Sequence, residues 1–124
     1  MNTITANINV SNKYEAFETW LKLTKSLHNL TPEEIKVLAM FLSERNELQD
    51  KIIDEELMNE HLLGTKIRKK VETAMNYEVT RLPNIISTMK KKGAIIDGKI
   101  NPRFIPNLTK DFDSYRLVFN VNIK

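Results

Sequence analysis

The dipeptide Asp97-Gly98, set between two short apolar runs, constrains the fold of this chain more than any other feature. A tight two-residue hairpin turn needs positive φ at both central positions, and Asp and Gly tolerate that conformation. Residues 94–96 and 99–101 are therefore predicted to form a short β-hairpin. The apolar spacing before residue 93 is helical, so this hairpin must follow directly on a helix.

Residues 81–91 are predicted to form that helix. Their apolar side chains fall at i, i+3, i+4 and i+7, which makes one stripe that must pack against a core: Leu82, Ile85, Ile86 and Met89. The other side carries polar side chains that can form hydrogen bonds: Arg81, Asn84, Ser87, Thr88 and Lys91. We expect Thr80 to cap the start of the helix and Gly93 to end it in a left-handed conformation.

A second amphipathic segment, residues 65–75, is predicted to form the preceding helix. Its apolar side chains are expected to face inward: Ile67, Val71, Ala74 and Met75. Its positive side chains mostly face outward: Lys66, Arg68, Lys69 and Lys70. Asn76 is placed to end this helix in the left-handed region, which Asn tolerates better than most residues. The link to the next helix is then only four residues long, with Tyr77 as its buried pivot.

The remainder of the chain is predicted to be organised around this unit. Residues 14–27 have the broad apolar face of a helix, and Thr31 opens another helix at residues 32–49 with a capping-box signature completed by Glu34. Residues 50–63 are read as a short helix or an irregular connection. Residues 4–10 and 115–123 alternate apolar and polar side chains, with only Val118 out of the pattern, which predicts two terminal strands. These strands need partners, either each other, the hairpin, or a second subunit across a two-fold axis.

Length and composition fit one ordinary globular domain spanning residues 1–124. The chain has 124 residues, of which 41% are hydrophobic and 28% are charged, which is enough for one core but hardly for two. It contains no cysteine, so disulfides and thiolate chemistry are excluded. No run of eighteen apolar residues and no signal-peptide pattern is present, so we expect a cytoplasmic protein that does not contact a membrane.

The net charge of +3 hides a strong asymmetry along the chain. Residues 33–60 contain nine acidic and three basic side chains, whereas residues 61–110 contain eleven basic and three acidic ones. The second segment, with a net charge of +8, coincides with the two predicted helices and the hairpin. This coincidence is typical of a surface that contacts nucleic-acid phosphates, although lysine-rich solvated surfaces are also common.

Residues 64–104 resemble a winged helix-turn-helix domain of the MarR-like class, in which a recognition helix ends in a lysine-rich Lys-Lys-Lys-Gly sequence and runs into a wing. The run Leu-Thr-Pro-Glu-Glu at residues 30–34 resembles the start of the helix that opens many such domains. Residues 99–104 are similar to the wing strand of small replication-initiator proteins of plasmids and phages. The resemblance covers roughly residues 30–106 and implies a mainly α-helical fold with a small β-hairpin wing, extended by an N-terminal helix and terminal strands.

The resemblance and the charge pattern predict sequence-selective binding of double-stranded DNA, without a cofactor or metal ion and without enzymatic activity. The expected base-reading residues are Asn84, Ser87, Thr88 and Lys91. The expected phosphate contacts are Lys66, Lys69, Lys70, Arg81, Lys90, Lys92, Lys99 and Arg103. We expect a transcriptional regulator of phage or plasmid type, for which a homodimer is one possible form. If the protein is encoded by a phage, we expect it in the cytoplasm of the host cell. Two alternatives stay open: origin binding in replication initiation, and a protein-interaction module of a phage assembly that docks a partner through the acidic segment 33–60.

Overall fold

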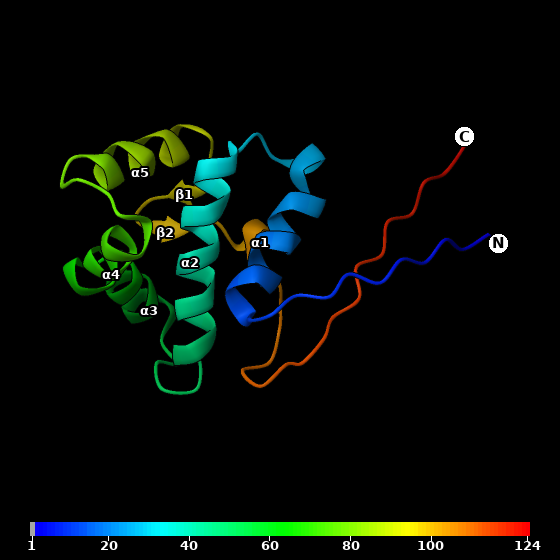
Figure 1. Cartoon of the computed structure of the whole chain (residues 1–124), viewed down its shortest axis with the longest axis horizontal. Coiled ribbons are helices and arrows are strands. Elements are labelled where there is room, and N and C mark those ends of the chain that lie inside the picture. Colours follow the sequence, from blue (N-terminus) through cyan, green and yellow to red (C-terminus); the bar gives the residue numbers. More distant parts are fainter. Residues whose placement is uncertain (1) are drawn as a thin grey trace.

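A computed structural model describes residues 2–124 and shows a mainly helical fold with one small hairpin (Figure 1). The helices are α1 (Lys13–Leu23), α2 (Pro32–Leu48), α3 (Glu55–Leu62), α4 (Thr65–Met75) and α5 (Arg81–Lys91). The hairpin consists of β1 (Ile95–Ile96) and β2 (Lys99–Ile100), and short 3-10 turns lie at Lys25–Leu27 and Pro102–Phe104. The predicted fold class is confirmed. No helix within residues 2–124 is long and apolar enough to cross a membrane.

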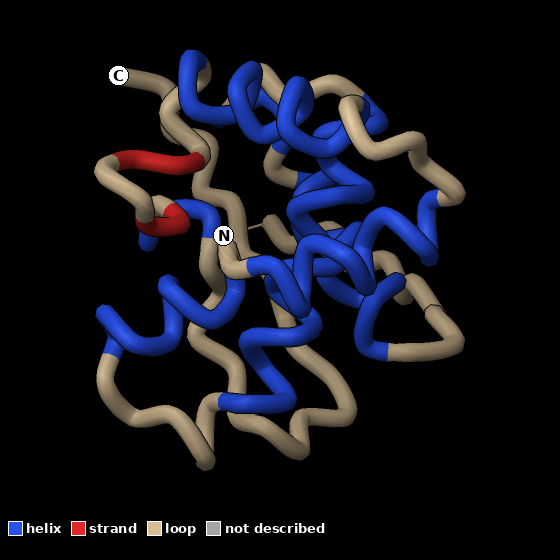
Figure 2. The backbone as a smooth tube through the Cα atoms, turned by 90° about the vertical axis from the view of Figure 1, so that its left-hand side faces the viewer, coloured by secondary structure: helices blue, strands red, loops and turns tan. Residues whose placement is uncertain are grey.

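Helix α2 runs through the centre of the molecule, with α1 on one side and α3, α4, α5 and the hairpin on the other (Figure 1). Figure 2 shows the two short strands of the hairpin, in red, beside the helices. Because it is covered on both sides, α2 is buried on several faces, and Val37, Leu38 and Phe41 have no exposed surface. The predicted capping box is present: the Glu34 amide donates to the Thr31 hydroxyl at 3.2 Å, and the Thr31 amide donates to the Glu34 carboxylate at 2.8 Å. These contacts fix where α2 begins and how it points.

Two of the predicted helix ends and the hairpin turn are confirmed by the backbone. Asn76 ends α4 with φ 56°, and Gly93 follows α5 with φ 82°. The amides of Gly93 and Ala94 then bond back to the carbonyls of Lys90 and Met89, which satisfies the last turn of α5. At the hairpin turn both Asp97 (φ 52°) and Gly98 (φ 72°) are left-handed, so Ile95 pairs with Ile100 and Ile96 with Lys99.

The start of α5 differs from the prediction. Thr80 precedes the helix, but it has helical φ and ψ and its side chain forms no capping hydrogen bond. A capping side chain reaches the free amides of a helix only when its own residue has an extended backbone. Because the backbone of Thr80 is helical, its hydroxyl does not cap α5. Tyr77 is half-buried rather than fully buried. Burial and the nearby Glu33 carboxylate raise the pKa of Tyr77 to about 12, so its hydroxyl stays protonated at neutral pH.

The helix predicted at residues 14–27 ends earlier, at Leu23. The Thr24 hydroxyl donates to the Trp20 carbonyl at 2.8 Å, and a 3-10 turn follows.

After the hairpin, residues 105–115 return across the base of α1 and α2. Their backbone is held there by the side chains of Asn46 and Gln49, which donate to the carbonyls of Thr109 and Leu108.

The two predicted terminal strands do not form. Residues 2–10 and 113–124 are extended, but no strand is assigned to them and their backbone forms no ladder with any described residue. Pairing with each other or with the hairpin therefore does not occur within the subunit, and pairing with a second subunit stays a prediction. The core of the fold lies between residues 13 and 112, and both ends of the chain project away from it (Figure 1).

Candidate nucleic-acid interface

Helix α5 presents a polar face to solvent. Its apolar stripe is buried against the core, as predicted: Leu82, Ile85, Ile86 and Met89. On the opposite side Asn84, Ser87 and Lys91 are exposed, and no described residue forms an ion pair with Lys91. An exposed amide, hydroxyl and amine on one helix face are groups that can form hydrogen bonds with base edges in a major groove.

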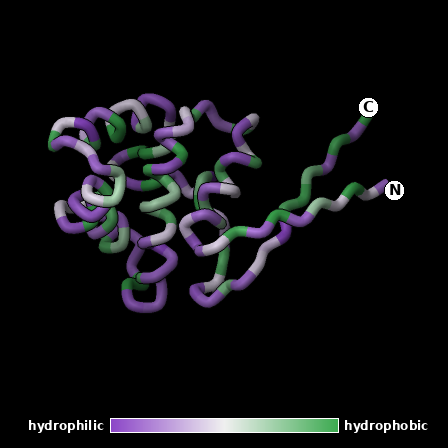
Figure 3. Tube along the Cα trace, viewed as in Figure 1, coloured by the Kyte–Doolittle hydropathy of each residue, from purple (hydrophilic) through white to green (hydrophobic). Residues whose placement is uncertain are grey.

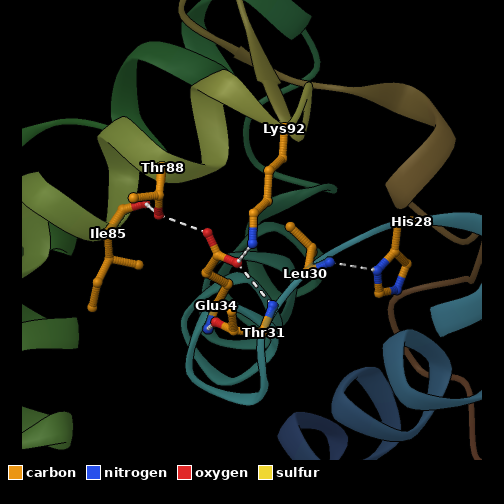
Figure 4. A network of polar contacts seen from close by, with 7 residues as sticks. All are labelled: His28, Leu30, Thr31, Glu34, Ile85, Thr88 and Lys92. Carbon is orange, nitrogen blue, oxygen red and sulfur yellow. Dashed lines mark hydrogen bonds and ion pairs between the residues drawn. The ribbon is translucent and has the colours of Figure 1, made fainter.

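Thr88, the fourth predicted base-reading residue, lies at the edge of this face and is turned toward α2. Its hydroxyl donates to Oε2 of Glu34 at 2.6 Å and lies 2.8 Å from the carbonyl oxygen of Ile85 (Figure 4). The hydroxyl proton is therefore engaged within the subunit. Thr88 keeps an accepting lone pair, but its position now serves to join α5 to the start of α2.

The carboxylate of Glu34 connects three segments of the fold (Figure 4). Oε1 accepts from the Thr31 amide at 2.8 Å and from Nζ of Lys92 at 2.6 Å, while Oε2 accepts from Thr88. The Glu34 side chain is only 4% exposed, whereas that of Lys92 is 28% exposed. This buried carboxylate accepts hydrogen bonds from three donors, and two of them, Thr88 and Lys92, connect the C-terminal end of α5 to the N-terminal end of α2.

The ionisation of Glu34 reflects these contacts. Burial by itself raises the pKa of a carboxyl group, but the hydrogen bonds from Lys92, Thr31 and Thr88 outweigh burial and hold the pKa of Glu34 below its usual 4.5. The folded protein therefore binds this proton less tightly than the unfolded chain does. The stabilisation is present in full above pH 4.5 and is lost as the pH falls through the lowered pKa.

This difference in pKa predicts a specific acid sensitivity. The free energy of unfolding of the native protein should exceed that of Glu34→Gln by a constant amount between about pH 5.5 and 7, and the gap should narrow below about pH 4.5. Urea denaturation of both proteins over this pH range measures the gap. If the unfolding free energies of the two proteins differ by the same amount down to pH 3, then folding does not change the pKa of Glu34.

Three of the eight predicted phosphate-contacting residues are engaged by acidic side chains of α2. Lys70 pairs with Glu44 at 2.5 Å, Arg81 pairs with Glu33, and Lys92 pairs with Glu34. The other five are exposed, and no carboxylate of residues 2–124 lies within 4.0 Å of them: Lys66, Lys69, Lys90, Lys99 and Arg103. Exposed lysines without an acidic partner are thus present on α4, at the end of α5 and on the hairpin, and also elsewhere in the described chain at Lys25, Lys36 and Lys51.

The acidic segment 33–60 is largely occupied within the subunit. Six of its nine carboxylates form ion pairs with basic side chains of the same chain: Glu33, Glu34, Glu44, Glu47, Asp50 and Glu55. A further one, Asp54, accepts from the Leu57 amide and caps α3. Most of the acidic side chains of this segment are therefore paired with basic side chains of the same chain.

The hairpin is fixed in place by a buried asparagine that the sequence did not mark. Oδ1 of Asn59, on α3, accepts from the Ile100 amide at 2.9 Å, and Nδ2 of Asn59 donates to the Glu55 carbonyl at 2.8 Å. On the other side, Nδ2 of Asn101 donates to the carbonyl of Gly93 at the end of α5 at 2.9 Å. These bonds hold the hairpin, and with it Lys99, rigidly beside α5.

The comparisons with known proteins give no relative from which to transfer a function: no family model, no curated protein and no solved structure matches the chain. Within residues 2–124, no group of three or more His, Asp or Glu side chains is arranged to hold a metal ion. The exposed face of α5 and the cations around it are the most specific arrangement that the described residues offer.

Proposed function

We propose that the protein binds double-stranded DNA through the outward face of α5. The observation that supports this proposal most directly is the exposure of Asn84, Ser87 and Lys91 on one helix face, opposite its buried stripe. A helix of this kind inserts into the major groove when neighbouring cations hold the phosphates on either side. The proposal gives α5 the role that the recognition helix has in the winged helices that residues 64–104 resemble.

The proposed contacts divide into two classes. Asn84 pairs with an adenine edge and Lys91 with guanine acceptors, while Ser87 bonds to either. The phosphates are held by four lysines of α4, α5 and the hairpin that have no carboxylate within 4.0 Å: Lys66, Lys69, Lys90 and Lys99. α4, α5 and the hairpin all lie on the side of α2 that faces away from α1 (Figure 1), so these four lysines belong to one part of the molecule. Arg103 lies instead in the turn Pro102–Phe104, beside Trp20 and His28 on the α1 side.

The internal ion pairs favour DNA over a basic protein partner. Docking through the segment 33–60 requires free carboxylates, and most of those in this segment are already bound to cations of the same chain. The biological use that we propose for DNA binding is control of transcription in the cytoplasm, by analogy with the MarR-like winged helices.

A salt titration of binding to random and to selected duplexes tests the proposal. If all four of these lysines contact phosphates, the logarithm of the binding constant should fall with the logarithm of salt concentration with a slope of about −3.6. A selected duplex should bind more tightly than a random one at every salt concentration, because base contacts add to the phosphate contacts. No measurable binding at low salt would refute the proposal.

Two neighbouring lysines of α4 provide a matched pair of variants. Lys69→Ala should weaken binding to every duplex and reduce the salt slope by about one unit, because this amine has no partner in the subunit. Lys70→Ala should have a smaller effect, because its amine is held by Glu44 at 2.5 Å. Titration of both variants on one random duplex measures the difference. Equal losses for Lys69→Ala and Lys70→Ala would show that the ion pair with Glu44 opens when DNA binds.

A further inference from the structure

The two ends of the chain form extended tails that lack partners. Residues 2–10 and 116–124 leave the body beyond α1 in the same general direction (Figure 1). Within the described chain, none of their backbone amides or carbonyls forms a backbone hydrogen bond. Extended backbone with a full row of free donors and acceptors is the template on which another strand pairs.

The tails begin close together on the same helix. The N-terminal tail ends at Asn12, whose side chain caps α1 by accepting from the Glu15 amide at 2.8 Å. At the root of the C-terminal tail, the Tyr115 hydroxyl donates to the Ala16 carbonyl at 2.8 Å. Phe112 packs edge-on against Phe17 with ring centroids 5.7 Å apart. One tail runs toward this root and the other away from it, so the two have opposite chain directions, as in an antiparallel pair.

Each tail carries an exposed apolar face. In the N-terminal tail Ile4 is 99% exposed and Ile8 is 57% exposed, and in the C-terminal tail Val121 is 92% exposed and Ile123 is 102% exposed. The alternation of apolar and polar residues along both tails is visible in Figure 3. Apolar side chains in such a row are stable in water only when another surface covers them.

The tails also lack the features that normally keep an open strand from pairing. Natural edge strands are protected by lysines, prolines or inward-pointing charges. Residues 2–10 and 117–123 contain no charged residue and no proline, and their polar positions are threonines and asparagines. The charges of the C-terminal tail are confined to its two ends, Arg116 and Lys124, so a second copy brings a matching neutral edge and the same apolar face between them.

We propose that two copies of this chain associate through these tails, which pair across a two-fold axis to form one antiparallel β-sheet. Two strands from a single subunit make a ribbon that is marginal in water, whereas four strands from two subunits pair more backbone groups and cover both apolar faces. The dimer leaves α5 free, because the tails project from the α1 side of α2 and α5 lies on the other side (Figure 1). The inference therefore does not depend on DNA binding.

The experiment is sedimentation of the full-length protein without DNA, combined with amide hydrogen exchange. The native protein should have twice the 14.4 kDa mass of one chain, and amides in residues 2–10 and 117–123 should be protected. Val121→Asp places a charge on the apolar face and should yield monomers with unprotected tails. Its side chain is exposed in the subunit, so the helical circular dichroism should stay unchanged and separate lost association from lost folding.

Asn122→Asp is the matched control, because it adds the same charge at the adjacent position on the opposite side of the tail. This variant should remain dimeric. A native protein that is monomeric at all concentrations, with or without protected tails, would overturn the proposal. A dimer that survives Val121→Asp would also overturn it, because the subunits would then associate elsewhere, and equal dissociation by both variants would contradict pairing through the apolar face.

Discussion

Replacing Glu34 with alanine should lower the free energy of unfolding by about 3 kcal/mol, a large part of the stability of a domain of this size. The change removes a buried carboxylate that accepts from Lys92, Thr31 and Thr88. Removing one member of a buried ion pair costs about 3–5 kcal/mol when its partner stays buried. The loss should lie at the lower end of this range, because the Lys92 side chain is 28% exposed and its amine can turn into water.

Urea denaturation followed by circular dichroism measures this loss, and Glu33→Ala is the matched control. Glu33 and Glu34 occupy the same first turn of α2, so both substitutions remove one negative charge near the same helix N-terminus. Glu33 pairs with Arg81 at the surface, with side chains 38% and 51% exposed, and its loss should cost about 0.5 kcal/mol. Similar losses for both variants would mean that only the charge at the helix end matters and that the network to α5 contributes nothing.

The parts of the fold that the sequence predicted correctly are decided by neighbouring residues. The capping box at Thr31, the left-handed Asn76 and Gly93, and the turn at Asp97 all follow from backbone conformations that one or two side chains favour. The buried stripe of α5 follows from helical periodicity in the same way. These features need no knowledge of the rest of the chain, and this is why each appears in the structure where it was expected.

The features that the sequence did not predict depend on residues far away in the chain. Thr88 and Lys92 meet Glu34 across 54 and 58 positions, and Asn59 meets Ile100 across 41. In the sequence Glu34 is recognisable only as part of a local capping box, and Asn59 is one polar residue among acidic ones. Only packing of α3 and α5 beside α2 brings these groups together, and no local pattern reports that packing.

The same limit applies to the candidate interface. Counting charges along the chain identified the basic segment, but it did not show that Lys70, Arg81 and Lys92 are held by α2. Periodicity identified the outward face of α5, and the exposure of Asn84 and Lys91 agrees with it. The sequence therefore predicted which segment carries the positive charge. Only the structure showed which of its cations form no ion pair within the subunit.

Charge reversal at Lys91, on the outward face of α5 at its C-terminal end, should have the largest effect on DNA binding. Lys91→Glu replaces an exposed cation with an anion directly where the proposed major groove lies, so it removes a base contact and adds repulsion from the phosphates. We expect affinity for a selected duplex to fall by on the order of 100-fold. Fluorescence anisotropy at fixed salt measures the loss, and the unfolding free energy should be nearly unchanged because the side chain is at the surface.

Lys51→Glu is the matched control for net charge. Lys51 is exposed and, within residues 2–124, forms no ion pair. It follows the C-terminal end of α2, whereas Glu33 and Glu34 contact α5 from the N-terminal end. If DNA binds at α5, Lys51→Glu should reduce affinity only weakly, through the general field of the protein. A loss as large as that of Lys91→Glu would show that total charge, and not the face of α5, determines binding.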